Sequence, residues 1–172
     1  MSRAILLTGA PGSGKTTVIR RAVSQLDGPV GGFYTQEIRS HGVRQGFEII
    51  TLEGRRGTLA HVNLRGRERV GKYGVDVAAV DRLAVTAIEK AIAAEGIVVI
   101  DEIGPMEIVS ERFRQAVLAA VDSEAKVLGT IVLRGLPFTD QIKAMPGVTL
   151  LQVRRDNQEA LLAQILGLLR AG

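Results

Sequence analysis

Apolar residues occur in two patterns along the chain, continuous runs and a spacing of three or four positions, and together these predict alternating strands and helices. Uninterrupted apolar runs, such as Ala4 to Thr8 and Ile97 to Ile100, are typical of strands buried on both faces of a parallel sheet. Between such runs, apolar residues recur every three or four positions, as from Asp76 to Glu95, where Gly96 ends the predicted helix. The same patterns predict helices from Lys15 to Leu26, Ser110 to Val121, Phe138 to Met145 and Asn157 to Leu169, and strands from Lys126 to Leu133 and Val148 to Val153.

A different arrangement is predicted between about residues 30 and 65. Three strands, Gly31 to Ile38, Arg44 to Leu52 and Gly57 to Leu64, follow one another with only short turns between them. Such short connections make them antiparallel neighbours, whereas the remaining strands are joined by helices through right-handed crossovers. We therefore predict an α/β fold, a three-layer α/β/α sandwich whose mainly parallel sheet carries an antiparallel elaboration on one edge. With no internal repeat or linker, residues 1–172 are expected to form one domain.

The amino-acid composition excludes several classes of protein. The chain has 46% apolar residues, enough for one core, and no cysteine, so disulfides and thiolate metal sites are excluded and a cytoplasmic location is expected. No apolar run approaches the roughly 18 residues of a membrane span, and the first strand starts too early to leave room for a signal peptide. The net charge of +4 allows a nucleic-acid partner, but 3% aromatic residues do not favour one. A monomer is expected.

The most specific chemical signal is the segment from Gly9 to Thr16, Gly-Ala-Pro-Gly-Ser-Gly-Lys-Thr, which matches the phosphate-binding pattern G-x-x-x-x-G-K-[ST]. A chain of this length matches by chance roughly one time in a hundred. The glycines allow a tight turn whose N–H groups surround phosphate oxygens, and the following helix adds the positive end of its dipole. Lys15 is expected to reach the β- and γ-phosphates and Thr16 to ligate Mg²⁺. The predicted nucleotide-binding residues are Gly9, Ala10, Pro11, Gly12, Ser13, Gly14, Lys15, Thr16 and Thr17.

A second signal is the pair Asp101-Glu102 at the carboxyl end of the most apolar strand. A phosphate loop requires an acidic partner for its Mg²⁺, and Asp101 has the position for this role, with Thr16 as the other metal ligand. Glu102 is expected to orient or deprotonate a water that attacks the γ-phosphate. Because many small-molecule kinases carry their acid on other strands, the adjacent glutamate favours hydrolysis.

These motifs and their spacing make the chain similar to the THEP1-type nucleoside-triphosphatases, which are P-loop NTPases of the RecA-like, additional-glutamate class. The resemblance implies Mg²⁺-dependent hydrolysis of several nucleoside triphosphates (ATP, GTP, CTP and UTP) to the diphosphate and phosphate. One departure is Pro105, where the family more often has lysine. The resemblance extends over nearly the whole chain, through Gly9 to Thr16, Gly32 to Arg39, Gly46 to Leu52, Arg69 to Val75, Val99 to Glu107 and Leu128 to Ile131.

Several assignments remain open at this level. Arg69, or Lys72 beside it, is a candidate to stabilise charge on the transferring phosphoryl group, with Arg134 as a further candidate. Thr130 is a candidate to contact the attacking water or the γ-phosphate, or is an ordinary strand residue. An alternative function is a nucleotide or nucleic-acid kinase with Glu37 as the base near its acceptor, and another is a nucleotide-driven switch. Asp156 and Glu159 resemble a capping box for the last helix.

Overall fold

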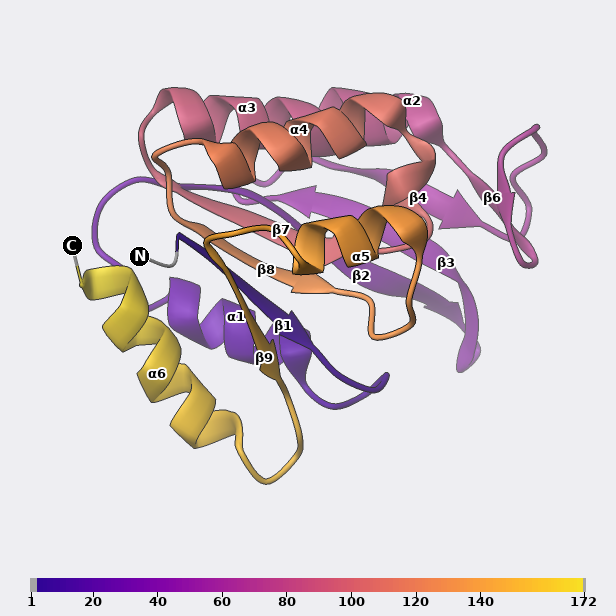
Figure 1. The fold of residues 1–172 in the computed structure, drawn as a ribbon. Coiled ribbons are helices and arrows are strands. Elements are labelled where there is room, and N and C mark those ends of the chain that lie inside the picture. Colours follow the sequence, from indigo (N-terminus) through magenta and orange to yellow (C-terminus); the bar gives the residue numbers. More distant parts are fainter. Residues whose placement is uncertain (1–2, 172) are drawn as a thin grey trace.

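The computed structural model describes residues 3–171, and its strands form one sheet in the order β5-β6-β4-β3-β2-β7-β8-β1-β9 (Figure 1). Five neighbouring strands, from β2 to β9 in this order, are parallel, and the other four extend the sheet in antiparallel fashion. This confirms the predicted fold class. The strands are β1 (Ala4–Thr8), β2 (Val30–Ser40), β3 (Val43–Thr51), β4 (Arg56–His61), β5 (Arg69–Val70), β6 (Tyr73–Val75), β7 (Ile97–Ile103), β8 (Val127–Ile131) and β9 (Val148–Gln152).

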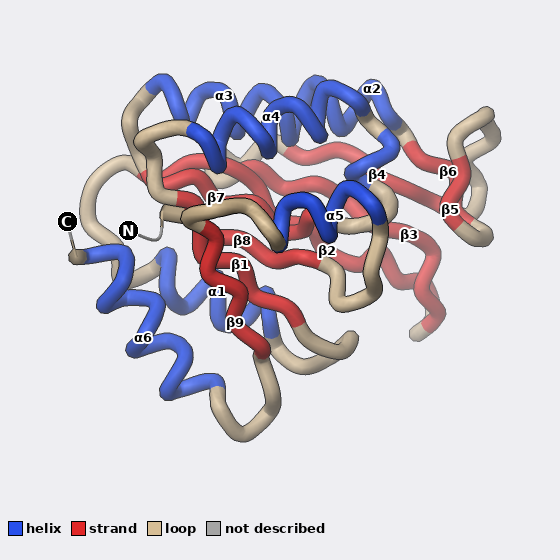
Figure 2. Tube along the Cα trace, viewed as in Figure 1, coloured by secondary structure: helices blue, strands red, loops and turns tan. Residues whose placement is uncertain are grey.

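Helices cover the two faces of this sheet unequally (Figures 1 and 2). Helices α1 (Lys15–Val23) and α6 (Gln158–Arg170) pack on one face of the parallel strands, and their apolar residues form one core with Leu7 and Leu128. The other face carries a larger core around Phe33 and Phe113. Its helical cover consists of α2 (Val77–Ala79), the π-helical turn η1 (Val80–Val85), α3 (Thr86–Ala93), α4 (Glu111–Asp122) and α5 (Pro137–Lys143).

The topology brings the two sequence signals together. β8 lies between β1 and β7, and all three strands are parallel, so the loop after β1 and the residues at the end of β7 meet at the same edge of the sheet. The register between β7 and β8 shifts between Ile100 and Ile103, and the peptide bond from Asp101 to Glu102 in this stretch is cis. A short 3₁₀ turn, η2 (Glu107–Val109), follows β7 on the same side.

Two sequence-based details are corrected by the structure. Residues 69–75, where the sequence predicted no strand, form the hairpin β5–β6, and its strand β6 pairs with β4 toward the far edge of the sheet. The capping box is also wrong, because α6 begins after Asn157 without a side-chain cap. Asn157 instead accepts a hydrogen bond from the Arg154 N–H at 2.7 Å, and Glu159 pairs with Arg21 of α1 at 2.6 Å.

Candidate active site

The phosphate loop connects β1 to α1 at the carboxyl edge of the parallel strands. Gly12 and Gly14 have φ angles of 77° and 97°, a left-handed conformation that a side chain would strain. The loop is anchored from α6, since Gln158 Nε2 donates to the Ser13 carbonyl oxygen at 2.8 Å. The first N–H groups of α1 have no intrahelical acceptor and lie at the positive end of the helix dipole. The loop therefore offers an anion a ready-made set of donors.

Lys15 begins α1, with its side chain folded over this loop. Its Nζ donates to the carbonyl oxygen of Gly9 at 2.8 Å, a contact between the first and last parts of the motif. The ammonium group is close enough to Asp101 and Glu102 for its charge to lower the pKa of both carboxyls. Thr17, predicted to join the nucleotide site, is exposed in the same first turn. The predicted residues from Gly9 to Thr17 thus lie together in the loop and first helical turn at this edge.

Asp101 lies between two hydroxyl groups from different elements. Thr16 Oγ1 of α1 donates to its Oδ2 at 2.8 Å, and Thr130 Oγ1 of β8 donates to its Oδ1 at 2.6 Å. The carboxyl is only 2% exposed, and burial raises its pKa above the ordinary value although both hydroxyls and two nearby cations oppose this. The sequence pattern anticipated that Thr16 and Asp101 meet. Thr130, left open between two interpretations, contacts Asp101.

Glu102 follows Asp101 and is partly buried beside Gly104. A Cβ at residue 104 would lie 2.6 Å from Glu102 Oε1, so only glycine leaves room for the carboxylate in this position. Burial raises the pKa of Glu102, the nearby charge of Lys15 lowers it, and Asp101 raises it further. A carboxylate with a raised pKa is better suited to accept a proton near neutral pH.

Glu107 is a further acid at this edge that sequence reasoning left without a role. It is 4% exposed, and burial raises the pKa of its carboxyl well above the ordinary value, with the charge of Glu102 adding to the effect. Its Oε2 has no hydrogen-bond partner, and among residues 3–171 this holds for only two other buried side-chain atoms, Thr8 Oγ1 and Ser13 Oγ. All three belong to segments around the phosphate loop. Buried polar atoms usually have a hydrogen-bond partner, so these three set this edge apart from the rest of the described core.

A cavity of about 360 Å³ adjoins the phosphate loop on the side of β9. Residues from the loop form one wall, and Leu133, Arg154 and Arg155 line the rest together with Gln152 and Val153. The Leu133 side chain is 49% exposed, unusual for a large apolar residue. The cavity therefore offers an apolar surface and two guanidinium groups beside the phosphate-binding backbone.

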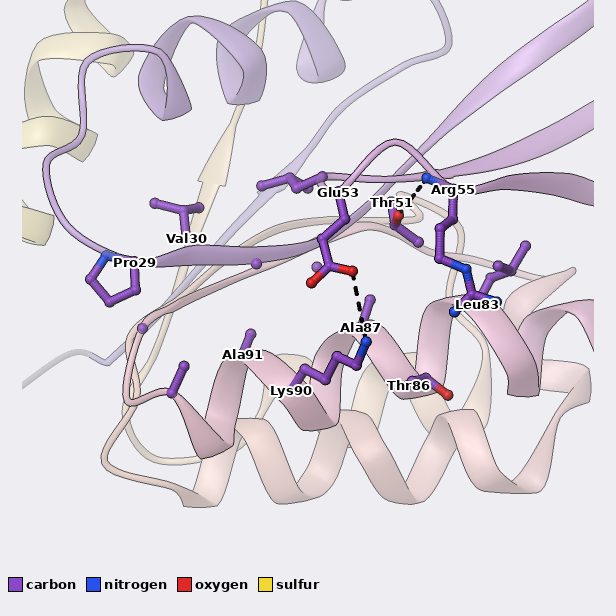
Figure 3. Close-up of a pocket in the computed structure, with 15 residues that line it drawn as sticks. Pro29, Val30, Thr51, Glu53, Arg55, Leu83, Thr86, Ala87, Lys90 and Ala91 are labelled. Carbon is purple, nitrogen blue, oxygen red and sulfur yellow. Dashed lines mark hydrogen bonds and ion pairs between the residues drawn. The ribbon is translucent and has the colours of Figure 1, made fainter.

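A second cavity lies at the opposite, amino-terminal end of β2, between the β3–β4 turn and α3 (Figure 3). Its floor consists of small residues such as Ala87 and Ala91, and Glu53 pairs with Lys90 at 3.7 Å across its opening. It contains neither a loop of free N–H groups nor any of the buried carboxylates. In the part of the chain that the structure describes, the phosphate loop and the buried carboxylates are thus gathered at the carboxyl edge.

Arg69 is not brought to this edge, which corrects its sequence-based assignment. Six strands separate β5 from β1 in the sheet, roughly 30 Å at the usual strand spacing. The Arg69 guanidinium is exposed and donates to the carbonyl oxygens of Leu64 at 3.2 Å and Lys72 at 2.9 Å, so it stabilises its own hairpin. An arginine side chain cannot span the remaining distance to the phosphate loop.

Comparison with known proteins agrees with this geometry. A family model described as NTPase matches residues 4–166. The nucleoside-triphosphatase THEP1 of Thermotoga petrophila is 42% identical over 166 residues, which cover 96% of this chain and 92% of the relative. The chain belongs to the THEP1-type NTPase family. The human cancer-related nucleoside-triphosphatase is 40% identical, with 96% of both chains covered.

Solved structures of this NTPase family have the same fold. The crystal structure of THEP1 from Aquifex aeolicus superposes with a TM-score of 0.89 at 34% identity, covering 98% of this chain and 99% of the other. The solution structure of the human cancer-related nucleoside triphosphatase gives a TM-score of 0.82 at 36% identity, with 98% of both chains covered. In residues 3–171 of this THEP1-type chain, no helix has the length and apolar character to cross a membrane.

Proposed function

We propose that this enzyme hydrolyses nucleoside 5′-triphosphates of any common base to the diphosphate and phosphate, with Mg²⁺. The carboxylate of Asp101, hydrogen-bonded to Thr16 and Thr130 at the edge of the phosphate loop, is the observation that carries the proposal. Family membership supports triphosphate hydrolysis as such. The breadth of substrates and the metal are inferred from the side chains around the loop.

The oxygen ligands at this edge fit Mg²⁺. Thr16 Oγ1 and Asp101 Oδ2 are hard donors that lie 2.8 Å apart, so both would hold the ion, Asp101 mostly through water. Within residues 3–171, no group of three acidic, histidine or cysteine side chains is arranged to hold a metal by itself. The remaining ligands must then be phosphate and water oxygens, as is usual for Mg²⁺ with a nucleotide. When bound, the ion would neutralise charge on the β- and γ-phosphates.

Glu102 is the group we assign to the attacking water. The water oxygen forms a bond to the γ-phosphorus in line with the bond that breaks to the bridging oxygen, and Glu102 accepts the water proton. The loop N–H groups and Lys15 offset negative charge on the phosphates. Arg69 is left out of this mechanism because of its distance from the site.

The cavity beside the loop supports a wide choice of bases. A site that selects one base needs free donors and acceptors aimed at its edge, and rejects other bases because those groups stay unpaired. Two nearby amides are already engaged within the protein: Asn157 contacts Arg154 N–H and the Gln152 carbonyl, and Gln158 contacts the Ser13 carbonyl. Leu133 and the two arginines can pack against the flat face of any base.

The kinase alternative gains nothing from the site. Its expected base, Glu37 at the end of β2, pairs with the guanidinium of Arg39 at 2.7 Å and also with that of Arg44. Burial alone would raise the pKa of Glu37, but these two hydrogen-bonded arginines lower it overall. A carboxylate held in this way is a poor proton acceptor.

The test is phosphate release from ATP, GTP, CTP and UTP with Mg²⁺ and no acceptor, for the parent, Glu102→Gln and Glu37→Gln. We expect release from all four, slowed about a hundredfold or more in Glu102→Gln with nucleotide binding preserved, and unchanged in Glu37→Gln. Release from one nucleotide only would contradict the proposed breadth. Turnover in Glu102→Gln equal to the parent would remove Glu102 from the mechanism, and release that depends on an acceptor would favour a kinase.

A further inference from the structure

Arg20 is a cation near the site that no sequence motif singled out. It lies on α1 four residues after Thr16, so the two side chains share one face of the helix. Helical side chains lean toward the N-terminus, which for α1 is the end at the phosphate loop. The guanidinium is thereby carried back toward Asp101, and its charge contributes, after the two hydroxyl hydrogen bonds, to lowering the pKa of that buried carboxyl.

An aromatic ring holds this guanidinium in place. Arg20 Cζ lies 4.4 Å from the centroid of the Tyr34 ring on β2. β2 and β7 pair in parallel with Phe33 opposite Ile100, which brings Tyr34 level with Asp101. Stacking on the ring restricts a side chain that would otherwise sample many rotamers in solvent. The cation is therefore held at the height of the buried carboxylates.

The guanidinium of Arg20 is available to bind an anion, whereas that of the next residue, Arg21, is not. Arg21 pairs with Glu159 of α6 at 2.6 Å, on the other side of the helix. No carboxylate in residues 3–171 lies within ion-pairing distance of Arg20. An exposed arginine usually forms an ion pair or samples many rotamers. Arg20 has no such ion pair, and the Tyr34 ring restricts its orientation.

We propose that Arg20, stacked on Tyr34, stabilises the negative charge that accumulates on the γ-phosphoryl group as it is transferred to water. This inference rests on the proposed hydrolysis and supplies the cation that Arg69 was expected to provide. Arg20 exchanges no atom in the step. The water oxygen bonds to the γ-phosphorus, the bond to the bridging oxygen breaks with its electron pair leaving on the diphosphate, and the proton passes to Glu102. An arginine supplied within the same chain is worth on the order of a thousandfold in rate.

The test compares Arg20→Ala, Arg20→Lys and Arg21→Ala in steady-state hydrolysis of ATP with Mg²⁺, with diphosphate affinity and thermal unfolding measured for each. For Arg20→Ala we expect kcat to fall about a hundredfold or more, while KM and diphosphate affinity stay within about threefold of the parent. Arg20→Lys keeps the charge without the planar stack and should recover part of the loss. Added guanidinium ion should raise the rate of Arg20→Ala and leave Arg21→Ala, which we expect to match the parent, unaffected.

The outcomes separate this inference from the function on which it rests. A kcat of Arg20→Ala within about threefold of the parent, or a change in KM alone, would overturn the role of Arg20, even where Glu102→Gln still slowed hydrolysis about a hundredfold or more. Should Arg20→Ala fail to fold, Tyr34→Leu tests the same pair: it removes the ring but keeps the cation, and an unchanged kcat would overturn the proposal. A parent enzyme that releases no phosphate would instead contradict the proposed function.

Discussion

The parallel half of the sheet and its antiparallel extension differ in what surrounds their acidic side chains. In the extension, and in the part of β2 that pairs only with β3, partly exposed acids pair with arginines: Glu37 with Arg39 and Arg44, and Glu48 with Arg56 at 2.6 Å. In the parallel half, Asp101 is buried against hydroxyl groups, without an arginine or lysine within ion-pairing distance in the described chain. Exposed pairs contribute little to stability, whereas a buried unpaired acid destabilises the fold.

This difference indicates that the parallel half contains the polar groups that lower stability and are available for catalysis. The orphaned oxygens of Thr8, Ser13 and Glu107 belong to the parallel half, at or beside its carboxyl edge. Glu37 and Glu48, by contrast, are each held by an arginine, so neither carboxylate is free to act on a ligand. We expect substitutions in the parallel half to change function strongly, and those in the extension to change it weakly.

Lys15→Ala should have the largest effect. Lys15 is the cation that reaches over the phosphate loop, and within residues 3–171 its ammonium donates a hydrogen bond only to the Gly9 carbonyl oxygen. Its removal leaves the phosphates without their main positive charge, and nucleotide affinity should fall at least about a hundredfold, with turnover lost. Titration calorimetry with a nonhydrolysable triphosphate measures this directly. Affinity within a few fold of the parent would mean that the loop N–H groups suffice.

Glu107→Gln should change how stability depends on pH. The folded enzyme holds the Glu107 proton at pH values where the unfolded chain, with a pKa near 4.5, has released it. The unfolded state then binds fewer protons, and the stability of the parent falls as pH rises above about 4.5, by up to about 1.4 kcal/mol per pH unit. Glutamine cannot ionise, so the free energy of unfolding of the variant relative to the parent should increase over this range, as urea titrations at several pH values would measure.

Glu159→Gln is a control of opposite sign for this measurement. The pKa of Glu159 is lowered by its hydrogen bond to Arg21, so its contribution to stability is present above the ordinary pKa and lost as pH falls. Removing it should make the variant relatively less stable as pH rises. Parallel curves for Glu107→Gln and the parent would show that the Glu107 carboxyl has the same pKa in the folded and unfolded states, and would contradict the expected upward shift.

Local sequence patterns were sufficient to predict the strand, loop and helix of the phosphate-binding motif and to place Asp101 beside Thr16, whereas the chemical roles of these residues stay predictions. The loop is a contiguous motif between a strand and a helix, and the acid follows directly on an apolar strand, so no long-range information is needed to assign either. The spacing could not predict which strands are neighbours: Thr130 contacts Asp101 because β8 pairs with β7. Glu107 gave only a weak signal, a single charge in the apolar run from Ile103 to Val109.

Some assignments could not be predicted from the sequence, because they depend on the register between strands or on which of several groups a side chain bonds to. Arg20 becomes relevant only because Tyr34 stands level with Asp101 across two strands. The capping box failed because the Asn157 side chain is taken by Arg154 N–H and the Gln152 carbonyl. Arg69 was misassigned because the local sequence around it does not specify which edge of the sheet this segment joins.

Arg69→Ala should have the smallest effect and tests the extension directly. Its guanidinium donates to two backbone carbonyl oxygens of its own hairpin, both in exposed surroundings, so its loss should cost about 1 kcal/mol or less. We expect kcat and KM to stay within about twofold of the parent, because six strands separate β5 from the strand that carries the phosphate loop. A hundredfold fall in kcat with an unchanged melting temperature would break the division between the two halves. It would mean that Arg69 reaches a phosphate from outside its own chain, as it would if a second molecule presented its hairpin to the site.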